Sequence, residues 1–460
     1  MKKDSKRDMN RRKFLKILGG GTLASTVALV GCDSKSQISG GNIHIGNVPT
    51  DKMTYRTEPK TGDKISLLGY GCMRWPRRSK TNASAEEDEI DQEAVNELVD
   101  YAIAHGINYF DTSPVYCKGM SEQATGIALS RYPRDKYFIA TKMSNQSCRS
   151  REDSLTMYYN SFKELKVDYF DYYLVHSVGT FDVFKERYLD NGILDFMQKE
   201  REAGRIRNLG WSFHGQKEFF DYMMNEAGVK WDFVQIQMNY FDWETVLGRT
   251  NVSAKYLYDE LTKRNIPAII MEPLLGGRLA NPNFKAQAMM RRADPDSSYA
   301  SWAFRFTGSQ PNVLTVLSGM TYMEHLQDNL LSFSPLQPLT DLDNKLLQHV
   351  TQTMLEFQNI NCTGCQYCMP CPYGLDIPGL FAHYNQCLNE GNFPDNTKDE
   401  NYREARRAFL IGFDRSVPKL RQANHCVGCK ICMSKCPQYI RIPDEMVKID
   451  KFVEQLKVNG

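Results

Sequence analysis

Four residues that could transfer or hold a proton lie at or just beyond the ends of short apolar runs in this 460-residue chain. They are Asp111, Tyr116, Lys142 and His176. A carboxylate, a phenol, an ammonium group and an imidazole are side chains that general acid–base catalysis uses. Taken alone, the spacing of Asp111 and Tyr116 favours a structural acid before a proline turn and a surface tyrosine. Whether these four residues are catalytic or structural therefore depends on the strands and helices that position them.

The segment from 53 to 335 alternates between strand and helix patterns. After a hairpin around Thr61-Gly62-Asp63 we expect strands at 67–71, 107–110, 137–141, 169–175, 208–211, 233–237, 266–271 and 313–317. We expect helices at 86–104, 121–129, 151–165, 193–203, 216–225, 252–264, 297–306 and 322–330. Eight such units predict a (β/α)8 TIM barrel. A doubly wound open sheet is the alternative, although no Gly-x-Gly-x-x-Gly turn follows an early strand.

On a TIM barrel, side chains that follow successive strands meet on one rim. Asp111 follows the second expected strand, Lys142 the third and His176 the fourth, and Tyr116 lies in the loop beside them. With these residues in this order, the segment resembles the aldo-keto reductase family, whose members carry an Asp, Tyr, Lys and His tetrad. Further matching motifs are Ser121-Glu122, Gly126, Gly210-Trp211-Ser212-Phe213, Val234 to Asn239, Glu272 to Gly277 and Leu317 to Met320 leading to Asp328-Asn329.

The resemblance implies reduction or oxidation of a carbonyl or sugar-type substrate. Tyr116 would donate the proton, while the Lys142 ammonium would stabilise the phenolate and so lower the pKa of Tyr116. Asp111 would hold Lys142, and His176 would orient and polarise the substrate oxygen.

The resemblance also implies a bound NAD or NADP. It places the nicotinamide against Ser212 and Gln235, and the phosphates beside the loops after the seventh and eighth strands, a usual phosphate site in barrels. These loops carry Pro273, Leu274, Ser318, Gly319 and Met320, and Asn329 follows in the last expected helix. Two positions depart from many relatives: Met271 stands in place of an aromatic residue that stacks on the nicotinamide. His325 stands in place of an arginine that contacts the 2′-phosphate, so NAD and NADP both stay open.

A predicted linker, 336–360, with a helix from Asp341 to Phe357, leads into a cysteine-rich tail, 361–460. The tail holds two similar runs, each followed by an Ile-Pro pair: Cys362, Cys365, Cys368, Cys371 and Cys426, Cys429, Cys432, Cys436. The runs resemble the bacterial ferredoxin signature, in which the fourth cysteine binds the other cluster. This implies two 4Fe–4S clusters, one on Cys362, Cys365, Cys368 and Cys436 and one on Cys426, Cys429, Cys432 and Cys371.

Other readings of the tail are weaker. Zinc sites usually use two C-x2-C pairs, and structural disulfides fit the spacing less well. Helical patterns at 380–387 and 402–413 predict a mainly helical ferredoxin-like domain. The remaining cysteines, Cys72, Cys117, Cys148 and Cys387, are interpreted as packing residues or idle thiols.

The N-terminus, 1–32, combines a basic region with an apolar run too short to span a bilayer comfortably. Asn10 to Lys16 resembles the twin-arginine export signal, which implies export of a folded bacterial protein to the periplasmic or cell-surface side. Leu29 to Cys32 resembles a lipobox, which would anchor the protein through a lipid on Cys32; the alternative is a chance cysteine in a segment cleaved further on. A flexible tether at 33–52 follows.

Composition adds little to these motifs. A net charge of +2 favours neither a nucleic acid nor an acidic partner. The leading hypothesis is an exported, NAD(P)-dependent oxidoreductase of a carbonyl or sugar-type substrate, with two 4Fe–4S clusters for electron transfer and a membrane-associated redox partner as a further expectation. The rivals are an idle barrel that serves as a binding module for an electron-transfer protein, and an active reductase with structural clusters.

Overall fold

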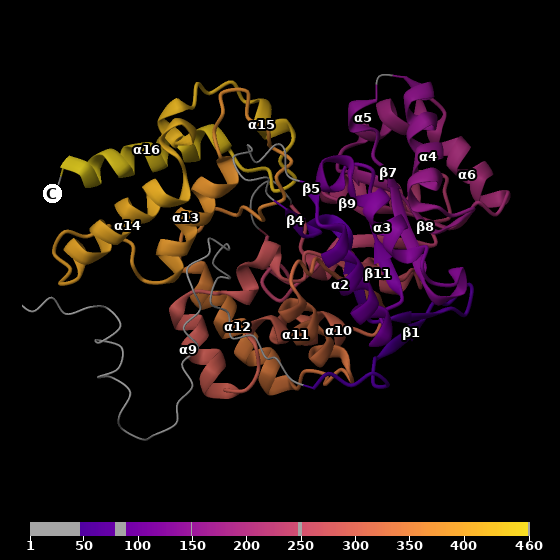
Figure 1. The fold of residues 1–460 in the computed structure, drawn as a ribbon, viewed down its shortest axis with the longest axis horizontal. Helices are drawn as coiled ribbons and strands as arrows, with labels where there is room; N and C mark the ends of the chain where they lie inside the picture. Colours follow the sequence, from indigo (N-terminus) through magenta and orange to yellow (C-terminus); the bar gives the residue numbers. More distant parts are fainter. Residues whose placement is uncertain (1–46, 79–88, 149, 247–250, 459–460) are drawn as a thin grey trace, which may run out of the picture. The chain divides into compact units, whose positions relative to one another are not determined.

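The computed structural model describes residues 47–78, 89–148, 150–246 and 251–458, all within one compact unit. Eight parallel strands close into a barrel in the order β10-β11-β12-β3-β6-β7-β8-β9. Helices surround these strands (Figure 1). The strands are β3 (Leu68–Gly71), β6 (Tyr109–Asp111), β7 (Phe138–Met143), β8 (Phe170–Val178), β9 (Ile206–Phe213), β10 (Phe233–Gln237), β11 (Ala268–Met271) and β12 (Val313–Ser318). The closed order confirms the predicted TIM barrel and excludes the open sheet.

The strands are buried on both faces, as parallel strands covered by helices must be. In β6 all three residues are buried, and so are Ala140, Thr141, Lys142 and Met143 of β7. Inside the barrel, the Tyr109 and Tyr172 rings meet edge to face at 5.0 Å and Phe233 packs on Tyr172 at 5.1 Å. This filled interior leaves the carboxyl ends of the strands as the place for a site.

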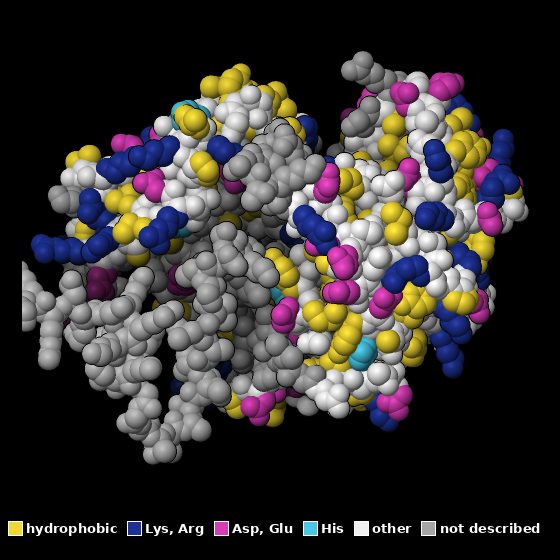
Figure 2. All heavy atoms as spheres, in the orientation of Figure 1, with side chains coloured by type: hydrophobic (Ala, Val, Ile, Leu, Met, Phe, Trp, Pro, Cys, Tyr) yellow, Lys and Arg dark blue, Asp and Glu magenta, His cyan; other side chains and the backbone are white. Residues whose placement is uncertain are grey.

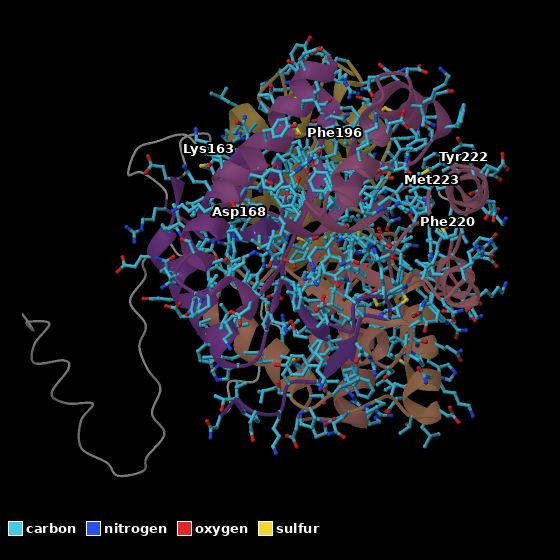
Figure 3. All side chains as sticks on the ribbon, turned by 90° about the vertical axis from the view of Figure 1, so that its right-hand side faces the viewer. Lys163, Asp168, Phe196, Phe220, Tyr222 and Met223 are labelled. Atoms are coloured by element: carbon cyan, nitrogen blue, oxygen red, sulfur yellow. The ribbon has the colours of Figure 1, made fainter. Side chains whose placement is uncertain are left out.

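Helices cover the outside of the barrel close to where the sequence predicts them. They are α3 (Ser121–Leu129), α4 (Arg151–Leu165), α6 (Ile193–Glu202), α7 (Lys217–Asn225), α8 (Ala254–Lys263), α10 (Tyr299–Gly308) and α11 (Met323–Phe333). A capping box between Ser150 and Asp153 starts α4, as expected for this cap. Figure 3 labels Phe196 on α6 and Phe220 and Met223 on α7; Phe220 and Met223 are buried, and Phe196 packs on Tyr158.

The first barrel helix differs from its prediction. It is α2 (Gln92–Ala104), capped by Asp91, whose carboxylate accepts from the Ala94 amide, so it does not begin at residue 86. The residues just before the cap form β5 (Glu89–Ile90), which pairs with β4 (Arg77–Arg78). The predicted hairpin does form, from β1 (Tyr55–Thr57) and β2 (Lys64–Ser66).

Two helices pack beside the barrel's last units. The predicted linker helix forms as α12 (Asp341–Leu355), and it packs on α9 (Phe284–Ala293), which the sequence analysis missed. On the face drawn in Figure 2, basic and acidic side chains are interspersed over the barrel helices, in keeping with the small net charge.

The tail has its own hydrophobic core. It is built by α13 (Ile377–Asn389), α14 (Tyr402–Ser416) and α16 (Ile442–Val458), around Leu380, Phe381, Phe409, Phe413 and Met446. Both Ile-Pro pairs start helices, α13 and α16, so the sequence repeat is also a structural repeat. The predicted signal, lipobox and most of the tether lie outside the described residues. No helix among the residues described is long and apolar enough to cross a membrane.

Candidate active site

A buried ion pair lies at the centre of the barrel rim. The Lys142 ammonium donates to Asp111 Oδ1 at 2.5 Å and to the Thr112 carbonyl at 2.8 Å, and the Lys142 side chain is completely buried. Gln235 Nε2 contacts the other Asp111 oxygen at 3.4 Å. Burial raises the pKa of Asp111, while the Lys142 charge and these hydrogen bonds oppose the rise. Strands β6 and β7 are neighbours, which places the two side chains together.

Tyr116 completes this group from the loop after β6. The Lys142 ammonium lies 5.0 Å from the centre of the Tyr116 ring, and the His176 ring meets Tyr116 edge-on at 6.0 Å. Burial raises the pKa of Tyr116 well above its ordinary value, and the neighbouring Tyr367 adds to the rise. The lowering expected from Lys142 is therefore not found, because the effect of burial on the pKa of Tyr116 is larger. Tyr116 carries its proton at neutral pH.

His176 is held as a neutral imidazole. Its Nδ1 lies 2.5 Å from Ser144 Oγ, which in turn lies 2.7 Å from Ser113 Oγ. Burial lowers the pKa of His176 well below its ordinary value, and the Lys142 charge lowers it further. A neutral imidazole fixed through one nitrogen can use the other to orient a substrate oxygen. The structure thus brings the four predicted catalytic residues together on one rim.

The residues predicted to hold a dinucleotide lie on the same rim, but several of them already have partners. Ser212 Oγ accepts from the Ser177 amide at 2.8 Å, and Asn329 Nδ2 donates to Ser318 Oγ at 3.0 Å. The Met320 carbonyl accepts from Tyr70 Oη at 2.6 Å. Burial lowers the pKa of His325, so this position offers no positive charge to a 2′-phosphate at neutral pH.

Tail residues cover the loop after β11, which contains Pro273 and Leu274. A Cβ placed on Gly276 would lie 2.3 Å from Thr363 Cα, so the two backbones touch. Arg74 Nη2 donates to the Thr363 carbonyl at 2.8 Å, and the Arg74 side chain also lies against Gly319. The residues present therefore do not fit a dinucleotide whose phosphates rest on this loop.

The eight tail cysteines line two cavities with the predicted grouping. Cys362, Cys365, Cys368 and Cys436 line one of them, which we call the first cavity. Cys371, Cys426, Cys429 and Cys432 line the second cavity. Each set therefore takes three cysteines from one run and one from the other. Four thiols around one space fit a cubane cluster, which thiolates bind. All the described cysteines are free, which excludes disulfides among them, and Cys387 is buried as predicted.

Sequence reasoning missed the residues that join the tail to the rim. Tyr367, between Cys365 and Cys368, hydrogen-bonds through its side chain to Tyr116. Glu272 is held at a positive φ of 54° at the end of β11. Burial raises the pKa of Glu272, while Arg74 and the Gly276 amide oppose the rise. Only the position of Tyr367 inside a cysteine run could have signalled it, because the contact depends on how the tail packs.

A family model places this architecture among known proteins. Residues 67–351 match the aldo/keto reductase family. The chain belongs to the aldo/keto reductase family. Residues 361–442 match a 4Fe–4S dicluster domain, which replaces the zinc alternative. This chain is thus an aldo/keto reductase barrel followed by a helical iron–sulfur domain, and it is an oxidoreductase by family.

Relatives of this aldo/keto reductase match about two thirds of the chain. L-galactose dehydrogenase of Arabidopsis thaliana is 24% identical over 67% of this chain and 97% of its own length. The uncharacterized oxidoreductase YqkF of Bacillus subtilis is 27% identical over 63% of this chain and 93% of its own. A probable voltage-gated potassium channel subunit beta of Arabidopsis thaliana is 22% identical over 65% and 97%.

Solved structures agree with the fold. The thermostable aldo-keto reductase Tm1743 superposes with a TM-score of 0.52 at 22% identity, over 65% of this chain and all of that one. The aldo-keto reductase AKR11C1 of Bacillus halodurans, in its holo form, gives a TM-score of 0.51 at 20% identity, over 65% of this chain and 96% of that one. At this identity the likeness establishes the barrel and leaves the substrate open.

Proposed function

We propose that this chain interconverts a small carbonyl or sugar-type substrate and its alcohol at Tyr116, with its tail cysteines holding two 4Fe–4S clusters that transfer electrons. The observation that carries the proposal is the buried Lys142–Asp111 ion pair beside Tyr116 and His176. A buried ion pair is weak evidence for stability, because hydrophobic residues of similar volume often do as well. Its position against a phenol and an imidazole on a barrel rim is better explained by catalysis.

Each residue has a distinct task in the proposal. His176, fixed by Ser144, donates a hydrogen bond to the substrate oxygen and sets its orientation. Tyr116 gives its proton as negative charge develops on that oxygen. Lys142 stabilises the phenolate left behind, and Asp111 keeps Lys142 charged and in place. Burial of the group excludes water and strengthens these interactions.

The clusters supply electrons one at a time when bound. Reduction of one carbonyl to its alcohol takes two electrons and two protons, and two clusters can hold one transferable electron each. NAD or NADP, which the family resemblance implies, does not supply the electrons, because Thr363 covers the loop expected to bind its phosphates.

We also propose that the folded protein is exported by the twin-arginine route with its clusters in place, and that Cys32 carries a lipid. The motifs at Asn10 to Lys16 and Leu29 to Cys32 support this. Cell fractionation of wild type and of an Arg11→Lys, Arg12→Lys variant tests export. Retention of the variant in the cytoplasm is expected, and unchanged export would contradict the proposal.

The carbonyl chemistry is tested with Tyr116→Phe, which removes one hydroxyl. The protein is purified without oxygen, reduced with a small one-electron donor and supplied with carbonyl compounds, and the alcohol is identified. We expect the variant to lose about 10²- to 10⁴-fold in turnover, the usual contribution of a general acid. Tyr159→Phe, at an exposed position on α4, is the matched control. Equal rates for wild type and Tyr116→Phe would favour the idle barrel.

A further inference from the structure

Both chain segments that supply cysteines to the first cavity rest on the barrel rim. In the first segment, Asn361 lies one residue before Cys362, and its Oδ1 accepts from Arg278 Nη1 of the barrel at 2.9 Å. From the other, Tyr439 Oη donates to the His214 carbonyl at 2.7 Å, three residues after Cys436. The first cavity is therefore fixed to the rim on two sides.

Glu272 and the first segment together occupy the place where the loop after β11 would otherwise bind phosphate. In the loop after β11, Gly276 and Gly277 have positive φ angles of 68° and 100°, a conformation that exposes backbone amides. The Gly276 amide donates to the Glu272 carboxylate, and the Thr363 backbone lies directly on Gly276. A carboxylate at this place repels a phosphate, and the Thr363 backbone removes the space for one.

Little room remains beside this loop. A cavity of about 80 Å³ lies between the barrel and the tail, lined by residues that include His214, Gln237, Arg278 and Gln438. Sites for small ligands usually have roughly 300–1,000 Å³, and a dinucleotide is larger than most small ligands. The cavity is far below that size.

At the other end of the expected nucleotide site, Tyr367 reaches Tyr116. Tyr367 lies between two cysteines of the first cavity. One short segment therefore carries cysteines of the first cavity and also a side chain that is hydrogen-bonded to the proton donor, Tyr116. We propose that the first cysteine run takes the place of a dinucleotide in this barrel, so that electrons reach the carbonyl site from the tail and not as a hydride. This inference rests on the proposed carbonyl chemistry at Tyr116.

The electron balance narrows the class of substrate. A carbonyl compound takes up two electrons from an external one-electron donor, such as a low-potential electron-transfer protein, together with two protons. The Tyr116 hydroxyl gives one proton, and solvent supplies the second and restores Tyr116. Because the electrons arrive singly, the substrate must hold one extra electron at modest cost. Conjugated dicarbonyl compounds of the quinone type do so, whereas isolated ketones do not.

The first test measures nucleotide binding, independently of activity. Anaerobically purified full-length protein with its iron content determined is titrated with NADPH and NADH by calorimetry, and any nucleotide released on denaturation is identified. We expect no saturable binding and no bound nucleotide. One nucleotide per chain, either retained or bound in the titration, would overturn the inference.

A pair of glycine variants tests whether the tail is what closes the site. Gly276→Ala places a methyl group against Thr363, whereas Gly277→Ala meets nothing within 4 Å. Both glycines have positive φ, so both substitutions carry backbone strain. We expect only Gly276→Ala to increase hydrogen exchange in 361–368. Equal exchange in the two variants would contradict the claimed contact.

The two proposals fail in different ways. If reduced nicotinamide binds and drives turnover that Tyr116→Phe abolishes, the carbonyl chemistry stands and this inference falls. If no nucleotide binds and Tyr116→Phe turns over at the wild-type rate with a one-electron donor, the carbonyl chemistry falls while the exclusion of the dinucleotide stands. Product formed only from isolated ketones and never from quinone-type compounds would overturn the assigned substrate class.

Discussion

Four cysteines line each of the two cavities of the tail, but the cavities have different neighbours. The first cavity lies beside Thr363 and Tyr367, which contact Gly276 and Tyr116 of the barrel. The second cavity is lined by Tyr373, which is 50% exposed, and by Val427, which is 60% exposed, and Cys429 is itself exposed. A repeat in the sequence has thus become two unequal sites. One belongs to the barrel rim, and the other is open to solvent, where an external donor could approach.

The largest expected effect comes from the buried Lys142–Asp111 ion pair on the rim beside the first cavity. Asp111→Ala leaves the Lys142 ammonium buried without its carboxylate partner. We expect a loss of about 3–5 kcal/mol in the free energy of unfolding of the barrel, the usual cost of breaking a buried pair. Denaturant unfolding followed by tryptophan fluorescence measures it.

The control for this prediction is the double variant Asp111→Ala, Lys142→Met, which removes both charges. It should recover much of the lost stability, because no uncompensated charge remains buried. A loss below about 1 kcal/mol in the single variant, as for exposed pairs, would contradict the buried geometry.

A buried carboxyl group of the barrel, that of Glu122, should make the free energy of unfolding depend on pH. Burial raises the pKa of Glu122 from its ordinary value of 4.5 to about 7, although Thr141 and Ser161 hydrogen-bond to its carboxyl group. Between these pH values the folded protein holds a proton that the unfolded chain has released. The free energy of unfolding therefore falls as pH rises through this window, by an amount on the order of 2 kcal/mol.

Thermal unfolding midpoints at pH 5 and pH 8 test this dependence. The wild-type midpoint should be lower at pH 8, and Glu122→Gln, which stays neutral, should reduce the difference between the two. An unchanged difference in the variant would assign the pH dependence to other groups.

The smallest expected effect is a difference in hydrogen exchange between variants of the two cavities. Cys365→Ser removes a ligand of the first cavity, and Cys429→Ser removes one of the second. We expect the first variant to raise hydrogen exchange in 112–119 and 272–278 by about tenfold, equivalent to ~1.4 kcal/mol of local opening free energy. Cys429→Ser should leave both segments unchanged. Equal effects of the two variants would mean that the first cavity has no special relation to the barrel.

Hydrophobic periodicity made the barrel predictable. The eight strands and the rim positions of Asp111, Lys142 and His176 all depend on residues close together in sequence. The start of α2 was missed because acidic residues before Asp91 fit a helix pattern, whereas Glu89 and Ile90 pair with β4. Local sequence does not encode such a pairing.

The site was less predictable where distant segments meet. The phenol was expected to have a lowered pKa, but burial of Tyr116 raises its pKa, and local sequence does not report how deeply this loop residue is buried. The contacts of Tyr367 and Thr363 arise from packing between the tail and the barrel, about 90 to 290 residues apart in the chain. No spacing of residues within the barrel or within the tail predicts these contacts.

The central claim is that the barrel site and the first cysteine run work as one unit. It is tested most directly by reducing the clusters without oxygen, removing excess reductant, and mixing the protein rapidly with a quinone-type carbonyl compound while following the visible absorbance of the clusters. The account predicts that the clusters are reoxidised as the two-electron product forms, and that Tyr116→Phe slows both events by about 100-fold or more. Clusters that stay reduced, or that reoxidise at the same rate in Tyr116→Phe, would contradict it.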